Sequence, residues 1–199
     1  MCEGRLDAVF FDEYFRNHLK IDAALVAVDE LQRKARSPRP STLLATCGGV
    51  PQLYDVAKRL ARQLLGSSTS ITIVVVGDSD RVSADKLHQE TVQYLSTFSK
   101  AHNTTPNVNL SNQNIKITDT KSGSSIDVIV HTIPTNLETK IAEALKNYHA
   151  VGSANQPKEV IDYVAEKQYG GDREEVVRES VWMLADENWL KKIGEAVRE

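Results

Sequence analysis

The sequence has few cysteines, no long apolar run and no excess of basic residues. Its two cysteines, Cys2 and Cys47, are too few for a disulfide scaffold, and nothing near them has the spacing of zinc ligands. No run approaches the ~18 consecutive apolar residues of a membrane helix, so we expect no membrane partner. Acidic side chains within the first twenty residues exclude a secretory signal peptide. We therefore expect a cytoplasmic protein.

The charge balance restricts how the chain could bind nucleic acid. It carries 24 Lys and Arg against 27 Asp and Glu, a formal net charge of −3. A protein whose whole surface neutralises phosphates would be basic. A local basic path, or metal ions that bridge acidic side chains to phosphates, remains compatible with this composition.

Hydrophobic spacing predicts alternating helices and strands. Ile71 to Val76 is apolar throughout, as in a central parallel strand that is buried on both faces. The order of elements predicts an α/β fold with a mostly parallel sheet flanked by helices, in a domain over residues 1–149, with a helical C-terminal extension over 150–199 packed on it. The expected helices are 7–20, 21–35, 51–64, 84–100, 136–148 and two or three from 157 onward, and the expected strands are 41–47, 71–76, 115–118 and 126–133, with a loop over 99–114.

Two carboxylates, Asp78 and Asp80, follow the strongest strand. Parallel strands of α/β sheets present their ligand sites at the carboxyl edge. Hard oxygen ligands concentrated there suit Mg²⁺ or Mn²⁺. Asp and Ser are also favoured ahead of a helix, so this motif is equally compatible with a helix N-cap.

A second acidic motif stands at the start of the chain. Glu3 is followed by Gly4, which permits a tight turn, and Asp7 either opens the next helix as a cap or contributes to a metal site. Arg5 and Arg81 each adjoin an acidic motif residue, where a guanidinium either holds a phosphate bidentately or forms a surface ion pair.

A glycine pair, Gly48-Gly49, follows the strand expected over 41–47. Its bare backbone N–H groups would let a phosphate approach, although a tight strand-to-helix turn explains the pair equally well. The phenols of Tyr14 and Tyr54 lie near the motif helices, and nothing singles out either as a nucleophile. Trp182 and Trp189, seven residues apart, are expected to pack in the core or to dock the helical extension.

The ordered motifs Glu-Gly-x-x-Asp-Ala-x-Phe, strand-Gly-Gly-helix and Val-Val-Val-Gly-Asp-Ser-Asp-Arg resemble the TOPRIM domain of topoisomerases, primases, recombination-mediator proteins and overcoming-lysogenization-defect-type nucleases. The resemblance covers residues 1–148, and its distinctive motifs lie in the first 80. It implies a TOPRIM-like Rossmann-type sheet in which Asp78 and Asp80 hold Mg²⁺. Glu3 would act as general acid or base or complete the metal shell, and Asp7 would serve a second metal.

The chain departs from the family pattern before the glutamate. The family has a full apolar strand there, whereas Met1 and Cys2 alone precede Glu3, so we expect a short first strand. Glu138 follows Pro134 in a segment similar to one in small stand-alone TOPRIM proteins. It is either an additional acidic ligand or a first-turn helix residue, where negative charge suits the helix dipole.

Three functions follow from these motifs. The first is metal-dependent hydrolysis of phosphodiester bonds in DNA or RNA. The second is a non-catalytic TOPRIM-like module that binds nucleic acid, a nucleotide or a partner protein. The third is a haloacid-dehalogenase-type phosphatase, which shares an Asp-x-Asp after an apolar strand and accepts Val82, but has that motif after its first strand. The oligomeric state stays open.

Overall fold

The computed structural model is an α/β fold, as predicted, with a mixed sheet. It describes residues 1–35, 42–65, 71–102, 106–152 and 154–198. Parallel pairing joins β1 to β2 and β3 to β6, and β5 and β4 extend the sheet antiparallel in the order β3-β6-β5-β4. The strands are β1 Ala23–Leu25, β2 Thr42–Leu44, β3 Ile71–Asp78, β4 Pro106–Ser111, β5 Asn114–Asp119 and β6 Ser125–Ile133.

The first three residues connect the two groups of strands. On one side, the Cys2 N–H donates to the Ala45 carbonyl at 3.0 Å. On the other, the Met1 ammonium donates to the Val74 carbonyl at 2.7 Å, and the Val76 N–H donates to the Met1 carbonyl at 2.9 Å. Residues 1–3 therefore link the two sheets through hydrogen bonds, with a single parallel bridge between Cys2 and Thr46 where a first strand was expected.

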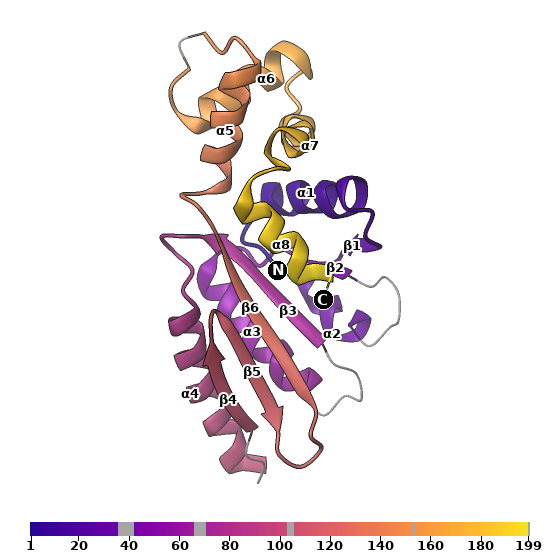
Figure 1. Cartoon of the computed structure of the whole chain (residues 1–199), viewed down its shortest axis with the longest axis vertical. Coiled ribbons are helices and arrows are strands. Elements are labelled where there is room, and N and C mark those ends of the chain that lie inside the picture. Colours follow the sequence, from indigo (N-terminus) through magenta and orange to yellow (C-terminus); the bar gives the residue numbers. More distant parts are fainter. Residues whose placement is uncertain (36–41, 66–70, 103–105, 153, 199) are drawn as a thin grey trace.

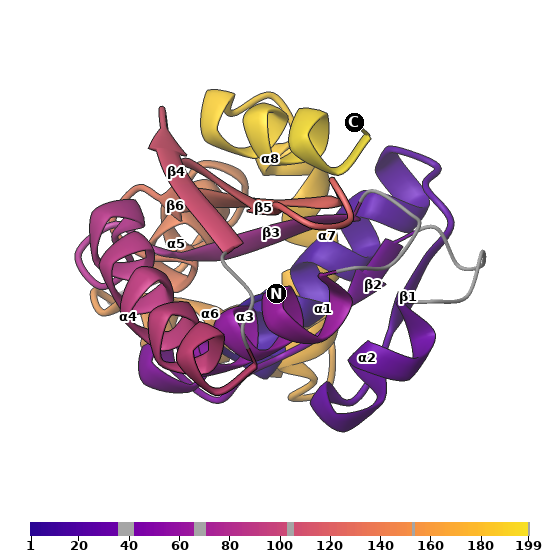
Figure 2. The same ribbon diagram turned by 90° about the horizontal axis from the view of Figure 1, so that it is seen from below.

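Helices cover both faces of the linked sheets (Figures 1 and 2). On one face, α3 and α4 pack with Val75 and Ile117 in one core; on the other, α1 and α8 share a second core with Val76. Above the carboxyl ends of β3 and β6, α5, α6 and α7 form a helical layer. The α-helices are α1 Arg5–Glu13, α2 Leu31–Lys34, α3 Val50–Leu64, α4 Ala84–His102, α5 Leu137–Tyr148, α6 Pro157–Gln168, α7 Arg173–Leu184 and α8 Asn188–Arg198, and a π-helical turn at Tyr14–His18 continues α1.

Two sequence-based predictions were wrong, both at sheet edges. Residues 21–35, expected to be one helix, contain the strand Ala23–Leu25 and only then a 3₁₀ turn and α2. The expected loop at 99–114 contains the last residues of α4 and the edge strand Pro106–Ser111. In both strands the pairing with a neighbour decides the conformation, and local propensity carries little of that information. The expected mostly parallel sheet is also corrected, because β4 pairs antiparallel with β5, and β5 pairs antiparallel with β6.

Among the described residues, no helix combines the length and the apolar composition that crossing a bilayer would require.

Candidate functional site

Glu3 lies directly against the end of β3. Its Oε1 accepts a hydrogen bond from the Asp78 N–H at 3.2 Å, and its Oε2 is 3.7 Å from Arg81 Nη1. The side chain is only 12% exposed. Its backbone carbonyl accepts a hydrogen bond from the Gly48 N–H at 2.8 Å, which fixes the segment that carries it. The fold thus brings together two acidic motifs that are 75 positions apart.

Asp78 ends β3, and the turn that follows carries Asp80 and Arg81. The Asp78 carbonyl accepts hydrogen bonds from the N–H groups of Arg81 and Val82, both at 3.0 Å, which close this turn. Burial raises the pKa of Asp78 to about 6, and the negative charges of Glu3, Asp7 and Asp80 add to the rise, while Arg81 opposes it. Asp80 itself is exposed.

Asp7 stands in the first turn of α1 and completes the rim. The helix begins earlier than an N-cap at Asp7 would require, because Gly4 is the N-cap. Asp7 is the third helical residue, and its Oδ2 accepts a hydrogen bond from the Gly4 N–H at 2.8 Å. Burial raises its pKa to about 6; the Gly4 N–H acts in the opposite direction, and the charges of Glu3 and Glu138 add to the rise. A capping role and a place in the acidic rim therefore coincide.

Glu138 reaches the same rim from α5. Asn136 caps that helix by accepting from the Thr139 N–H at 2.8 Å, which places Glu138 in the first turn. The loops after β3 and β6 are tied together, because the Ser79 N–H donates to the Ile133 carbonyl at 3.0 Å. The negative charge of Glu138 contributes to the raised pKa of Asp7. We therefore count Glu138 as the fifth carboxylate of a group that we call the acidic rim, which consists of Glu3, Asp7, Asp78, Asp80 and Glu138.

The acidic rim is not a closed metal cage. Within the described part of the chain, no three His, Cys, Asp or Glu side chains are arranged to hold one ion. Glu3 directs one oxygen to the Asp78 N–H and the other toward Arg81. The donor chemistry still fits a hydrated Mg²⁺, which binds through one or two carboxylates and keeps several waters. Asp78 and Asp80 fit such an ion, and Glu3 fits a place beside its waters.

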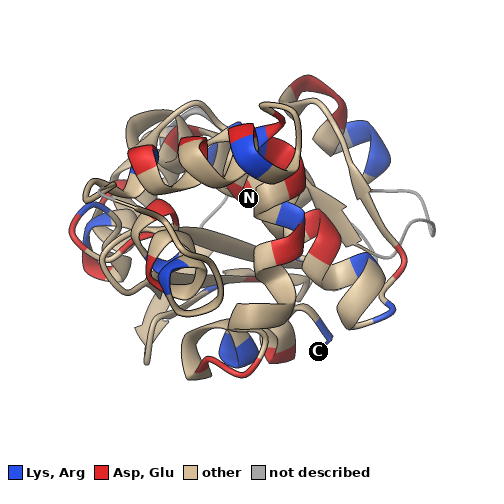
Figure 3. Cartoon of the chain, turned by 90° about the horizontal axis from the view of Figure 1, so that it is seen from above, with Lys and Arg blue, Asp and Glu red and all other residues tan. Residues whose placement is uncertain are grey.

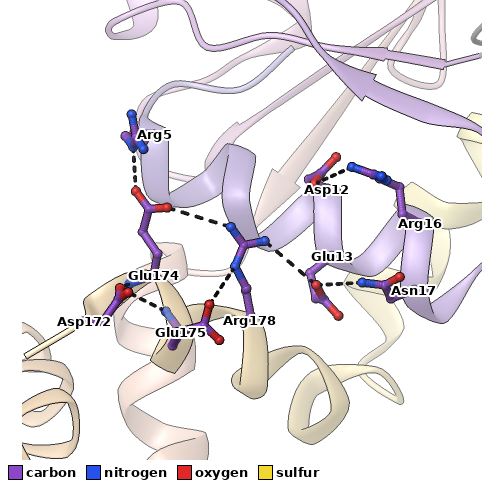
Figure 4. Close-up of polar contacts among 9 residues, drawn as sticks. All are labelled: Arg5, Asp12, Glu13, Arg16, Asn17, Asp172, Glu174, Glu175 and Arg178. Carbon is purple, nitrogen blue, oxygen red and sulfur yellow. Dashed lines mark hydrogen bonds and ion pairs between the residues drawn. The ribbon is translucent and has the colours of Figure 1, made fainter. Parts of the chain in front are cut away.

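The two arginines of the motifs have different surroundings. Arg5 is 80% exposed and turns to α7, where its Nε lies 2.6 Å from Glu174 Oε1 (Figure 4). Arg178 reinforces this α1–α7 contact through Glu13 and Glu174. Arg81 stays at the acidic rim, where its loose contact with Glu3 leaves the guanidinium 62% exposed. Arg81 is therefore the better placed of the two to meet a phosphate.

A concavity of about 570 Å³ opens beside Arg81 at the start of α3. Gly48 and Gly49 line it with φ angles of +78° and +121°, values that favour glycine, so the pair does form the strand-to-helix turn. Lys86 from α4 lines the same concavity. The strand-to-helix turn therefore forms part of the wall of this concavity.

Tyr54 has a role that the sequence did not indicate. Its ring is buried, and its hydroxyl accepts a hydrogen bond from the Ser83 N–H at 2.7 Å. This contact anchors the end of the segment 78–83 that carries Asp80 and Arg81. No spacing in the sequence connects Tyr54 to Ser83, since the contact depends on the packing of α3 against α4.

The raised pKa values predict that acid stabilises the native state. Asp7 and Asp78 titrate near 6 in the folded chain and near 3.8 in an unfolded one, so the native state holds more protons between pH 4 and 6. Their contribution to stability is greatest below pH 4 and declines as pH rises through 6. For Asp7 we expect a decline of roughly 1–3 kcal/mol. Urea unfolding from pH 4 to 7 measures it.

The control is Asp7→Asn, which keeps an oxygen for the Gly4 N–H and removes the charge. Its free energy of unfolding should fall less than that of the wild type between pH 4 and 7. Equal pH dependence of the free energy of unfolding in both proteins would show that the pKa of Asp7 is not raised in the native state.

Charge on the face above the carboxyl edge of the sheet is mixed. Figure 3 shows Asp and Glu segments interspersed with Lys and Arg segments around the N-terminus, with no expanse of one sign. Such a surface provides local contacts to an anion and no broad basic platform.

Comparison of the chain with family models, curated proteins and solved structures found no match. The geometry of the acidic rim and of the neighbouring concavity is therefore the basis for assigning a function.

Proposed function

We propose that this chain is a TOPRIM-like, Mg²⁺-dependent phosphodiesterase that cleaves DNA or RNA. The observation that carries the proposal is the contact of Glu3 with the Asp78 backbone, which places the N-terminal glutamate beside the Asp-x-Asp motif. Order of motifs and position at the carboxyl edge both agree with the resemblance seen in the sequence. The parallel bridge at Cys2 and the parallel pairing of β3 with β6 support the same Rossmann-type arrangement.

The acidic rim supplies the residues that such a reaction needs. Asp78 and Asp80 would hold the ion, which when bound makes a nucleophilic water available and neutralises charge on the phosphate. Glu3 is held by the Asp78 N–H with one oxygen, and its other oxygen, in loose contact with Arg81 at 3.7 Å, would accept a proton or orient a water once Arg81 turns to the substrate phosphate. Burial and mutual repulsion make the ionised forms of Asp7 and Asp78 unfavourable in the absence of a counter-ion. A bound cation would offset this negative charge and stabilise the rim.

The concavity beside Arg81 offers a path for the substrate backbone. Arg81 and Lys86 line it together with Gly48 and Gly49, and two acidic residues, Asp55 and Glu90, line it as well. A phosphate seated there would have the acidic rim next to it, because Arg81 contacts Glu3. The same arrangement accommodates DNA and RNA, since it contacts phosphates and no base.

A second function is favoured by a specific observation, the absence of a three-ligand cage within the described residues. In that case the fold is a TOPRIM-like module that binds a nucleic acid, a nucleotide or a partner protein at the concavity without turnover. Arg81 would then keep its contact with Glu3, which lies 3.7 Å away, and Glu3 would take no part in catalysis.

A cleavage assay separates the two functions. End-labelled single- and double-stranded DNA and RNA are incubated with the full chain in Mg²⁺, Mn²⁺, Ca²⁺ or EDTA. The enzyme predicts products in Mg²⁺ or Mn²⁺ and none in EDTA, and Mn²⁺-soaked crystals should show the ion at Asp78 and Asp80. Asp127→Asn, near the opposite end of β6, is the matched control and should cleave normally. Binding without products in every metal would establish the module.

A further inference from the structure

Gly77 occupies a crowded position between the two motifs. It lies in β3, paired in register with Thr132 of β6. Its φ is not in the left-handed region, so the backbone conformation itself admits any residue. Space does not: an added Cβ would lie 2.2 Å from Val82 Cγ2 and 2.8 Å from Glu3 Oε1. The requirement for glycine therefore comes from the two side chains that approach the strand.

The absence of a side chain at Gly77 leaves the space that the Glu3 carboxylate occupies. Because no Cβ projects from this position, the Glu3 carboxylate lies against the β3 backbone and accepts from the Asp78 N–H at 3.2 Å. In strands, glycine often marks a site where another group approaches the backbone closely. The approaching group here is an acid of the proposed catalytic site.

We propose that Gly77 is a positioning residue, which holds the Glu3 carboxylate in register with Asp78 and toward Arg81. The purpose of this positioning rests on the proposed phosphodiesterase function. The positioning itself rests only on the contacts of Gly77, Glu3 and Asp78. A side chain at this position would lift Glu3 from the Asp78 N–H and displace its second oxygen.

A simple Gly77→Ala change would not test this, because its Cβ also collides with the buried Val82 side chain. Val82→Ala removes the colliding Cγ2 and leaves a Cβ at 3.3 Å, a distance that a small shift relieves. In that background the flexible end of Glu3 is the group that must move. Val82→Ala is therefore the reference protein, and Gly77→Ala is added to it.

The experiment is a double-mutant cycle with Glu3→Ala, carried out in the Val82→Ala background. The first readout, independent of metal, is the NMR shift of the Asp78 amide proton. Gly77→Ala should move it farther upfield when Glu3 is present, by breaking the hydrogen bond, than when Glu3 is already alanine, where only the effect of the changed neighbouring residue remains. The second readout is Mn²⁺ affinity by electron paramagnetic resonance, which should fall about 10- to 100-fold with Glu3 present and no further without it.

The outcomes are distinguishable. An Asp78 amide that ignores Gly77→Ala, or that moves equally with and without the Glu3 carboxylate, overturns the positioning role. Circular dichroism and thermal unfolding check that the Gly77→Ala/Val82→Ala protein is folded. Failure of the reference protein to bind Mn²⁺, when the wild type also fails, counts against the proposed function, and the amide comparison still decides whether Gly77 positions Glu3.

Discussion

Asp78→Asn is expected to abolish metal-dependent cleavage and, at the same time, to make the protein more stable. Loss of one ion-holding carboxylate removes transition-state charge stabilisation, for which we expect a fall in rate of about 10²- to 10⁴-fold. Stability changes in the other direction, because the charge of Asp78 is disfavoured in the native state, as its pKa of about 6 indicates. Function and stability are therefore opposed at this residue.

The gain in stability should depend on pH. At pH 7 the wild type carries the disfavoured charge, and its neutral replacement should raise the free energy of unfolding by about 1–2 kcal/mol, after a discount for solvent screening. Below pH 4 the wild-type Asp78 is protonated when folded, so the advantage should vanish. Urea unfolding at both pH values measures the difference.

Asp127→Asn is the control for both measurements, since it stands away from the acidic rim. Its cleavage rate and its stability at pH 7 should match those of the wild type. A variant of Asp78 that cleaves normally would remove the basis for the proposed reaction. One that is inactive but destabilised at pH 7 would show that Asp78 has a favourable partner in the native state.

Trp189→Ala is expected to cost about 3–5 kcal/mol in the free energy of unfolding, the largest stability effect we predict. Trp189 is 8% exposed and stacks on Phe10 of α1 at a centroid distance of 6.3 Å. The neighbouring Leu190 and Ile193 are fully buried in the same core. Removing the indole would leave a cavity between α8 and α1 that these packed side chains cannot fill.

Trp182 provides the matched comparison. It lies on α7, is 53% exposed and contacts Tyr148 edge to face at 4.8 Å. Trp182→Ala should therefore cost no more than about 1 kcal/mol. Chemical denaturation of both variants measures the two losses, and equal losses would contradict the different packing of the two tryptophans.

The sequence alone could not show which of these two tryptophans is buried. Seven residues separate them, which would place both on one face of a continuous helix. The helix is interrupted at residues 185–187, so Trp182 belongs to α7 and Trp189 to α8. Both tryptophans contact residues of the expected main domain, Trp182 at Tyr148 and Trp189 at Phe10, but of the two only Trp189 is buried in the core.

Elements with a strong periodic signal were predictable. The stripe of α3 and the uninterrupted apolar run of β3 have the spacing that their burial requires. The edge strands β1 and β4 were not predictable from such a signal. The pairing partner of β1 lies 19 positions farther along the chain, and the sequence of β4 is largely polar. Val108 and Leu110 do alternate with polar residues in β4, a signal that a period-two count would have found.

The candidate site shows the same division. Residue type and position after a strand singled out Asp78 and Asp80, and the resemblance in motif order to the TOPRIM domain added Glu3 as their neighbour. Their hydrogen-bond partners were not predictable, since the Glu3 contacts with the Asp78 N–H and Arg81 depend on how closely residues 1–3 approach β3. The turn of Arg5 toward Glu174 depends likewise on the docking of α7.

The segment that carries Glu3 bonds to residues 43 and 73 positions farther along the chain, at Ala45 and Val74. Such distant pairings form late, because the entropy of closing both loops is lost before either contact is gained. During synthesis, residues 1–3 must wait until residues 74–76 have emerged before the second set of hydrogen bonds can form. A chain without these contacts does not hold Glu3 against Asp78, so the proposed nuclease would be inert until residues 1–3 have docked on β3.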